Sequence, residues 1–155
     1  MDQIIIIGTQ PPCPRCKLLT EVVTQKAKAM GLKAEIRHIA YTSPEAAEIA
    51  ATAGLVPGTA KDVAKKTGLE IRWDDASEIP QIFKNQIENL DLDLKPYSQL
   101  FKEVAILDHA FRPFENMAED LGILMTPVLI INGRVKHRGS VPLVSEIVNW
   151  LNELL

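Results

Sequence analysis

The clearest chemistry in this sequence comes from two cysteines, Cys13 and Cys16, with Pro14 and Arg15 between them. The apolar run Ile4–Ile7 comes shortly before the pair, and a segment with the spacing of an amphipathic helix begins at Pro14. This order places Cys13 at or next to the N-terminus of a helix, where free backbone amides and the helix dipole favour negative charge. We therefore expect the pKa of Cys13 to lie below the ordinary thiol value of about 8.5.

The residues beside Cys13 favour the same chemistry. Arg15 adds a full positive charge one or two residues from the sulfur. One helical turn brings both sulfur atoms to the same end of the helix, with Cys13 more exposed and Cys16 partly covered. An exposed thiolate with a second thiol in reach can attack a disulfide and then be released by its neighbour. The motif therefore predicts redox chemistry.

Three other interpretations of the cysteine pair remain open from the residues alone. A structural disulfide across two residues closes almost no loop and would stabilise the fold little. Buried core thiols would have prolines and an arginine as neighbours, namely Pro11, Pro12, Pro14 and Arg15. A zinc site usually needs four protein ligands, and histidines would have to supply the rest because the chain has no other cysteine.

Length and composition narrow the class of protein. A chain of 155 residues fits one domain, or one domain with a large insertion. The net charge of −3 without a basic run argues against a nucleic-acid partner. No apolar stretch approaches the roughly 20 residues of a membrane span, and Met1–Gln3 lacks the start of a signal peptide. We expect a cytoplasmic protein without a membrane partner, and in such a reducing compartment a CxxC pair is more often catalytic or metal-binding than structural.

The two ends of the chain predict a mixed sheet. Gln3–Gly8 is a buried strand, the helix after the cysteines ends at Gly31, and Ala34–Ala40 is a more polar strand, which together predict a parallel βαβ unit. Near the C-terminus, Asn132-Gly133 is a favoured hairpin turn. It joins an apolar strand at Val128–Ile131 to a polar strand at Arg134–Arg138, and a final helix covers Pro142–Leu155.

The segment between these ends, Tyr41 to Arg112, looks mainly helical. A capping serine and a proline start a helix at Ser43, and Thr59 starts another that stops at Gly68. Leu55–Gly58 is predicted to be a turn and Leu69–Trp73 to be extended. The remaining predicted helices are Ile79–Leu90, Leu100–Phe111 and, after a break or kink at Pro113, Glu115–Leu121.

Other polar residues in this sequence are expected to be solvated or satisfied. The histidines His38, His109 and His137 are scattered along the chain, and His38 lies near the C-terminal end of its predicted strand. Asp108 and His109 are assigned to the solvated face of their helix, and Trp73-Asp74-Asp75 to an acidic surface turn. Phe83, Phe101 and Phe111 are expected in the core of the helical segment, which could form a lid over the cysteines.

Thr126-Pro127 stands directly before the apolar strand Val128–Ile131. Proline cannot donate to a ladder, so it fits the first residue of a strand. Because only about 5–6% of X–Pro bonds are cis, the residues alone favour a trans bond here.

Taken together, the order of these elements resembles the thioredoxin fold. The stretches IIIIGT…CPRC and TPVLIINGRVKHRGSVP are similar to the small thioredoxin-like proteins of bacteria and archaea. The resemblance covers about residues 3–40 and 114–155. It predicts an α/β thioredoxin-like fold: β-α-β, then a β-hairpin and a helix, forming a four-stranded mixed sheet. Residues 1–40 and 114–155 would make the thioredoxin-like domain, and 41–113 a mainly helical insertion between the second and third strands.

The resemblance also implies roles for individual residues. Cys13 would be the attacking cysteine and Cys16 the resolving one, flanking Pro14 and Arg15, with no metal and no cofactor beyond their redox-active disulfide. Pro127 would be a cis-proline facing the pair, and Thr126 would offer backbone groups to an extended substrate. Gly139 and Ser140 would line the rim. The strand before the cysteines would be central, with Ala34–Ala40 and Arg134–Arg138 at the two edges.

Two positions depart from ordinary thioredoxin. Pro12 stands where thioredoxin has a tryptophan, and Ile7 stands where it has a buried carboxylate, six residues before the first cysteine. These departures argue against a generic thioredoxin role and leave open which group takes the proton during resolution.

The leading hypothesis is a thiol–disulfide oxidoreductase that acts on a protein or small-molecule disulfide and is regenerated by a reductase or another dithiol. One alternative is a soft-metal protein that binds Cu(I) or zinc through the same thiolates. Another is an interaction module in which the insertion acts and the CxxC pair is vestigial.

Overall fold

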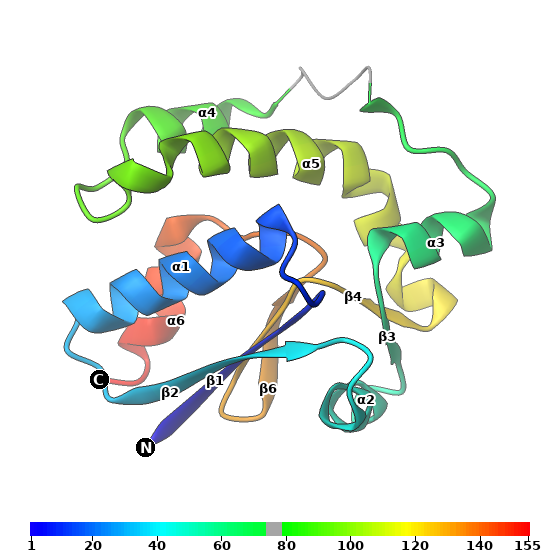
Figure 1. The fold of residues 1–155 in the computed structure, drawn as a ribbon, viewed down its shortest axis with the longest axis horizontal. Coiled ribbons are helices and arrows are strands. Elements are labelled where there is room, and N and C mark those ends of the chain that lie inside the picture. Colours follow the sequence, from blue (N-terminus) through cyan, green and yellow to red (C-terminus); the bar gives the residue numbers. More distant parts are fainter. Residues whose placement is uncertain (74–78) are drawn as a thin grey trace.

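A four-stranded mixed sheet lies at the centre of the fold, in the order β2-β1-β5-β6. The computed structural model describes residues 1–73 and 79–155 (Figure 1). β1 (Asp2–Gly8) pairs in parallel with β2 (Ala34–Ala40) and antiparallel with β5 (Val128–Ile131), which pairs with β6 (Arg134–Arg138). The predicted sheet is confirmed, with the strand before the cysteines in the middle and the two polar strands at the edges.

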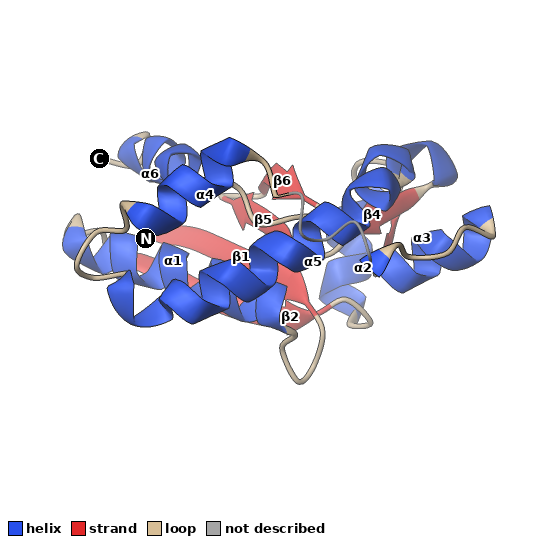
Figure 2. Ribbon diagram, turned by 90° about the horizontal axis from the view of Figure 1, so that it is seen from above, coloured by secondary structure: helices blue, strands red, loops and turns tan. Residues whose placement is uncertain are grey.

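Four helices are stacked on one face of this sheet. α1 (Pro14–Ala29) and α6 (Val144–Asn152) lie directly on it. α5 (Ser98–Met117) and α4 (Gln81–Glu88) form a further layer above α1, which Figure 2 shows from above. A short 3₁₀ turn at Lys95–Tyr97 leads into α5. The later part of the predicted helical segment, α4 and α5, thus covers the side of the sheet on which the CxxC helix lies.

The four isoleucines of β1 explain why it is the central strand. Ile4 and Ile6 belong to the apolar cluster under α1, α5 and α6, whereas Ile5 and Ile7 belong to the cluster on the opposite face. Successive side chains of a strand point to opposite faces, so a strand buried on both sides is a continuous apolar run.

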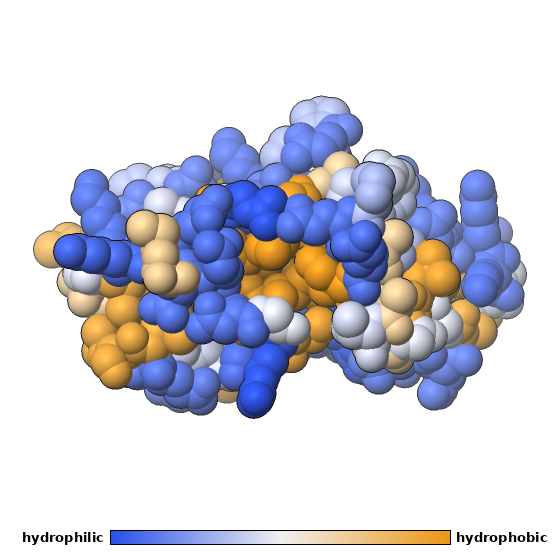
Figure 3. Space-filling view, turned by 90° about the horizontal axis from the view of Figure 1, so that it is seen from below, coloured by the Kyte–Doolittle hydropathy of each residue, from blue (hydrophilic) through white to orange (hydrophobic). Residues whose placement is uncertain are grey.

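α2 (Pro44–Ala51) packs against one end of the opposite face of the sheet. Ser43 caps this helix by accepting a hydrogen bond from the Ala46 amide, as its sequence predicts. Ala46 and Ala50, both fully buried, pack against the β1 and β5 side chains. Figure 3 shows this face from below, with apolar surface in a central hollow bordered by hydrophilic side chains.

A second, two-stranded sheet is absent from the sequence prediction. β3 (Val56–Gly58) pairs in parallel with β4 (Ile123–Met125), so the predicted turn at Leu55–Gly58 is wrong. Each strand is only three residues long, too short to show a period in the sequence. After β3, α3 (Ala60–Thr67) begins at a Thr59–Asp62 capping box and ends at Gly68, as predicted.

The prediction also misplaced the end of α5. The helix continues through Pro113 to Met117 without a break, and it bends in its last turns, which contain Pro113, so a kink rather than a break is present (Figure 1). Buried Phe111 and Phe114 flank the proline, and their packing offsets the lost backbone hydrogen bond. The predicted helix at Glu115–Leu121 is therefore wrong: its residues form the end of α5 and a 3₁₀ turn at Glu119–Leu121.

Two smaller expectations concern the segment before α4. Within the segment predicted to be extended, Leu69–Trp73, residues 69–72 form neither a strand nor a helix. Asp74 and Asp75 of the predicted acidic turn lie outside the described residues.

The division into a domain and an insertion stays a prediction. Within the described residues, Phe101 and Val104 of the insertion belong to the same apolar cluster as α1 and α6. None of the helices in residues 1–73 and 79–155 has the length and apolar character needed to cross a membrane.

The buried face of β1 gives a test of this packing. Replacement Ile6→Ala should lower the free energy of unfolding by about 2–5 kcal/mol, because Ile6 is fully buried and the change leaves a cavity. Val135→Ala, at a 37%-exposed position of β6, is the control and should change it by about 0.5 kcal/mol or less. Denaturant titration measures both, and equal losses would contradict the assigned burial.

Candidate redox site

Cys13 is the N-cap residue of α1. Its backbone is extended, with φ −71° and ψ 166°, and Pro14 follows at the start of the helix. The Cys13 amide donates a hydrogen bond of 2.9 Å to Thr9 Oγ1, which fixes the turn between β1 and the helix. The sulfur therefore sits where the free amides of the first turn converge.

The two cysteines are free thiols whose Sγ atoms lie 3.2 Å apart. This separation is longer than the roughly 2.05 Å of a disulfide bond. Cys13 is partly exposed and Cys16 is completely buried. The exposed and the covered sulfur are thus arranged as the helical spacing predicts.

The surroundings of the pair give the two thiols opposite acidities. A hydrogen bond from the Cys16 side chain lowers the pKa of Cys13 to about 5; burial opposes this shift, whereas the Cys16 amide, the charge of Arg15 and the Arg15 amide add to it. The pKa of Cys16 is raised by its hydrogen bond to Cys13, by burial and by the Cys13 charge. The reduced pair is therefore one thiolate and one thiol, with the negative charge on the exposed sulfur.

Arg15 is held differently from the sequence expectation. It is only 4% exposed and forms a buried ion pair with Asp108 of α5, with Nε 2.7 Å from Oδ1. Its guanidinium also donates to the Gly139 carbonyl and lies 4.9 Å from the centre of the Phe111 ring. Arg15 contributes less to the pKa of Cys13 than the Cys16 hydrogen bond does. Its main contacts anchor the CxxC turn to the predicted insertion.

Asp108 was wrongly assigned to a solvated helix face. It is 4% exposed, and its second oxygen accepts a hydrogen bond of 3.0 Å from the Val141 amide. Burial raises the pKa of Asp108, and Arg15 and the Val141 amide oppose that rise. The sequence contained a signal for this position, because Asp108 follows Val104 by four residues and precedes Phe111 by three. It therefore lies on the buried stripe of α5.

Gly139 and Ser140 do not line the rim of the site as expected. Both are buried, and the Gly139 amide donates to the Pro127 carbonyl at 3.0 Å. Gly139 has a φ of +87°, and a Cβ there would lie 2.7 Å from Cγ of Glu115, so a side chain would be strained and crowded. Gly139 thus connects the Pro127 strand with Arg15.

The Thr126–Pro127 peptide bond is cis. Thr126 is 4% exposed, and its amide donates to the Gly58 carbonyl of β3 at 2.9 Å. One of the backbone groups that Thr126 was expected to offer to an extended substrate, its amide, is therefore already bound within the chain, and the substrate-binding role of Thr126 stays a prediction.

A cavity of about 350 Å³ opens beside Cys13. Its walls come from α1, from the start of α3 and from α5, and its lining includes Ala60, Lys61, Trp73, Leu107, Phe111 and Thr126. Trp73 meets Phe111 edge to face, with ring centres 5.5 Å apart. The exposed thiol therefore faces a mainly apolar space with one lysine among its lining residues.

His38 and Gly8 were not assigned to the site from the sequence. A Cβ built on Gly8 would lie 2.3 Å from Cys16 Sγ and 2.8 Å from His38 Nε2, so Gly8 leaves space that the sulfur and the ring share. The sequence did contain a signal for His38: it lies near the carboxyl end of a strand that is parallel to the strand before the cysteines, and so at the same edge of the sheet as the CxxC turn. The register of the two strands, which decides the neighbour of His38, is not readable from the residues.

Within the described ranges, no three His, Cys, Asp or Glu side chains come together in a way that could hold a metal ion.

Comparison with known families gives one match. The family model described as Thioredoxin domain matches residues 104–152, just under a third of the chain. This stretch contains most of α5, the Thr126-Pro127 turn, the β5–β6 hairpin and α6, but not the cysteine pair. No curated protein and no solved structure matches the chain. The match and the sheet topology agree on the fold and support a redox role of the thioredoxin type in general.

The buried ion pair gives a test of how the CxxC turn is held. Replacement Asp108→Ala should lower the free energy of unfolding by about 3–5 kcal/mol, because it leaves the Arg15 charge buried without its partner. Glu45→Ala is the control, since it breaks an exposed ion pair with Arg37 and should change stability little. Comparable losses in the two variants, measured by denaturant unfolding, would contradict the anchoring role.

Proposed function

The chain is a thioredoxin-fold protein, and from this premise we propose that it is a thiol–disulfide oxidoreductase acting through Cys13 and Cys16. The observation that carries the proposal is the pair itself. A partly exposed thiolate at a helix N-terminus lies 3.2 Å from a buried thiol and faces a cavity.

The proposed reaction has two exchange steps. The Cys13 thiolate attacks one sulfur of a substrate disulfide, forms a mixed disulfide and releases the other substrate sulfur as a thiolate. Cys16 then attacks Cys13 Sγ, forms the Cys13–Cys16 disulfide and releases the second substrate sulfur. Two electrons pass from the dithiol to the substrate, so no bound cofactor is needed. A reductase or another dithiol would return the pair to its reduced form.

The surrounding residues support this cycle. At neutral pH the lowered pKa keeps Cys13 as the thiolate, which is the nucleophile. The ion pair of Arg15 with Asp108 fixes the turn between the cysteines, so the sulfur atoms keep their separation. The cavity beside Cys13 would receive the group attached to the substrate disulfide.

Alkylation of the reduced protein tests the state of Cys13. The rate of iodoacetamide labelling at Cys13 should rise with pH around a midpoint of about 5, because only the thiolate reacts. Replacement Cys16→Ala should move this midpoint up by about one to two pH units, since a hydrogen bond to a charged group contributes roughly 1.5–3 kcal/mol and one pKa unit is 1.36 kcal/mol. A midpoint of the unreplaced protein near that of a free thiol would contradict the assigned thiolate.

Trapping tests the exchange reaction. Replacement Cys13→Ser should abolish reduction of a test disulfide, whereas Cys16→Ser should hold the substrate as a mixed disulfide on Cys13, seen as added mass in the intact protein. The proposal fails if the unreplaced protein reduces no test disulfide and Cys16→Ser captures nothing from a cell extract. Stoichiometric Cu(I) or zinc on the anaerobically purified protein, lost in Cys13→Ser, would instead favour the metal-binding alternative.

A further inference from the structure

Among the buried side-chain nitrogen and oxygen atoms of the described residues, one has no hydrogen-bond partner: Nε2 of His38. The other ring nitrogen, Nδ1, lies 2.8 Å from the side-chain amide nitrogen Nε2 of Gln10. Buried polar atoms are nearly always paired, so an unpaired one at the end of a strand needs a reason.

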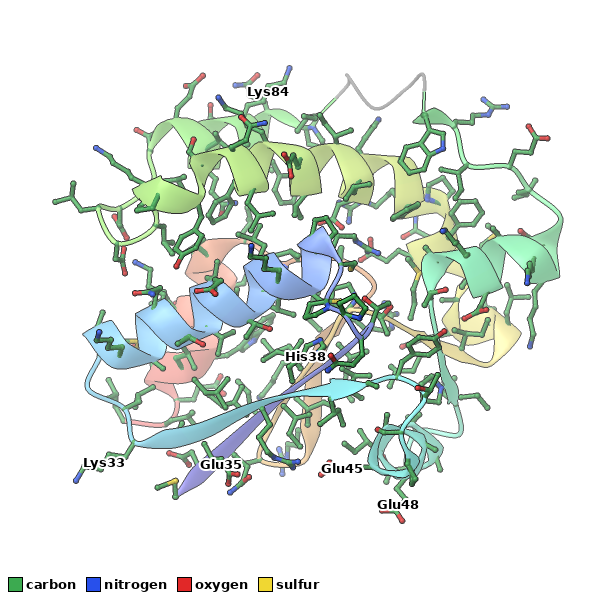
Figure 4. The ribbon with its side chains drawn as sticks, in the orientation of Figure 1. Lys33, Glu35, His38, Glu45, Glu48 and Lys84 are labelled. Carbon is green, nitrogen blue, oxygen red and sulfur yellow. The ribbon has the colours of Figure 1, made fainter. Side chains whose placement is uncertain are left out.

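The position of His38 on β2 places its Nε2 atom on the same side of the sheet as Cys16. His38 is paired with Ile6 across the parallel strands, and Ile6 belongs to the cluster under α1. In Figure 4 the labelled His38 lies between β2 and the start of α1, while Lys33 and Glu35 of the same strand region lie at the outer edge. Both His38 Nε2 and Cys16 Sγ would lie within 3.0 Å of a Cβ on Gly8. The missing side chain of Gly8 thus leaves them facing one space.

The resolving step needs a proton acceptor at this place. Cys16 is completely buried and its pKa is raised, so it must lose its proton before it can attack. In the reduced protein the Cys13 thiolate accepts a hydrogen bond from Cys16, but in the mixed disulfide Cys13 no longer carries the charge. Ile7 occupies the position of the expected carboxylate and is itself fully buried in the cluster on the other face.

We propose that His38 Nε2 takes the proton of the Cys16 thiol as Cys16 attacks the mixed disulfide, an inference that rests on the function proposed above. The S–H bond of Cys16 breaks, and its proton goes to the imidazole. The Cys16–Cys13 bond forms, and the bond between Cys13 and the substrate sulfur breaks. The leaving substrate thiolate carries the negative charge, and the imidazolium later returns its proton to that thiolate or to water.

Gln10 completes the arrangement. For Nε2 to accept a proton, Nδ1 must carry the ring hydrogen and donate it to the amide oxygen of Gln10. The amide nitrogen of Gln10 faces Nδ1 in this structure, so the proposed tautomer requires the exposed Gln10 amide to turn by 180° and present its oxygen to the ring. The backbone amide of Thr9, which hydrogen-bonds to Cys16 and lowers its pKa, would stabilise the thiolate as it forms.

The charges around His38 agree with a neutral base. Burial lowers the pKa of His38 below 6.5, and the Cys13 thiolate on α1 opposes this shift. This opposing charge disappears in the mixed disulfide. The imidazole is therefore unprotonated near neutral pH when Cys16 has to react.

A stopped-flow reaction of the reduced protein with dithiobis(nitrobenzoate) separates the two exchange steps. This aromatic disulfide releases one coloured thiolate when Cys13 attacks and a second when Cys16 resolves. In the unreplaced protein the second phase should slow as the pH falls through the pKa of His38, because the protonated ring accepts no proton. Above that pH the second phase should be nearly constant.

Replacement His38→Gln should slow the second phase by about 100-fold near neutral pH, at the lower end of the range for a positioned general base. It should also remove the plateau. The rate of the second phase should then keep rising with pH, because hydroxide or buffer has to take the proton of Cys16. The first phase should change less than about twofold. His109→Gln, a histidine on α5, is the matched control and should leave both phases unchanged.

Gln10→Glu provides a second variant that keeps the imidazole. Its carboxylate would hold the proton on Nδ1 and raise the pKa of His38, so the pH midpoint of the second phase should move up. The inference is overturned if His38→Gln leaves the pH profile of the second phase unchanged, if it slows both phases equally, or if Gln10→Glu does not move the midpoint. Absence of the first phase in the unreplaced protein would instead reject the proposed function.

Discussion

The ion pair between Arg15 and Asp108 is the interaction on which the site depends. It joins the residue between the two cysteines to α5, and both partners are almost completely buried. Each also binds the segment after β6, since Arg15 donates to Gly139 and Asp108 accepts from Val141. Two charges in the interior are costly unless their hydrogen bonds are satisfied, and here backbone groups supply the remaining partners. The CxxC turn, the helical segment and the C-terminal hairpin are thereby tied at one point.

Around this point the protein separates the tasks of its two sulfur atoms. The free amides of α1 and the Cys16 thiol stabilise charge on Cys13, and the same hydrogen bond discourages charge on Cys16. In the proposed reaction this arrangement favours Cys13 as the nucleophile but makes Cys16 a poor one, because its thiol holds its proton. A neighbouring base is one physical answer to this imbalance, and His38 occupies the space that Gly8 leaves beside Cys16. The sequence indicated a role for the charge of Arg15 beside Cys13. In the structure the main contacts of Arg15 are with Asp108 and Gly139, and its charge affects the pKa of Cys13 less than the Cys16 hydrogen bond does.

The sequence was sufficient for the sheet and for the place of the cysteines, because these depend on local patterns. Four successive isoleucines indicate a strand buried on both faces, and Asn132-Gly133 marks the hairpin. The sequence was not sufficient where contacts between distant segments determine the local structure. Pro113 is tolerated inside α5 because neighbouring phenylalanines are buried, and β3 and β4 exist only because they pair with each other. Asp108 was misjudged because its charge was given more weight than its spacing.

The bond between the Thr126 amide and the Gly58 carbonyl has a consequence for recognition. The Gly58 carbonyl, rather than water, occupies the Thr126 amide. Because β3 belongs to the same chain, its effective concentration at this amide is high. For the function proposed here, a substrate backbone that pairs with the Thr126 amide would have to displace the Gly58 carbonyl of β3 first. A substrate group that enters the cavity beside Cys13 would not have to displace β3.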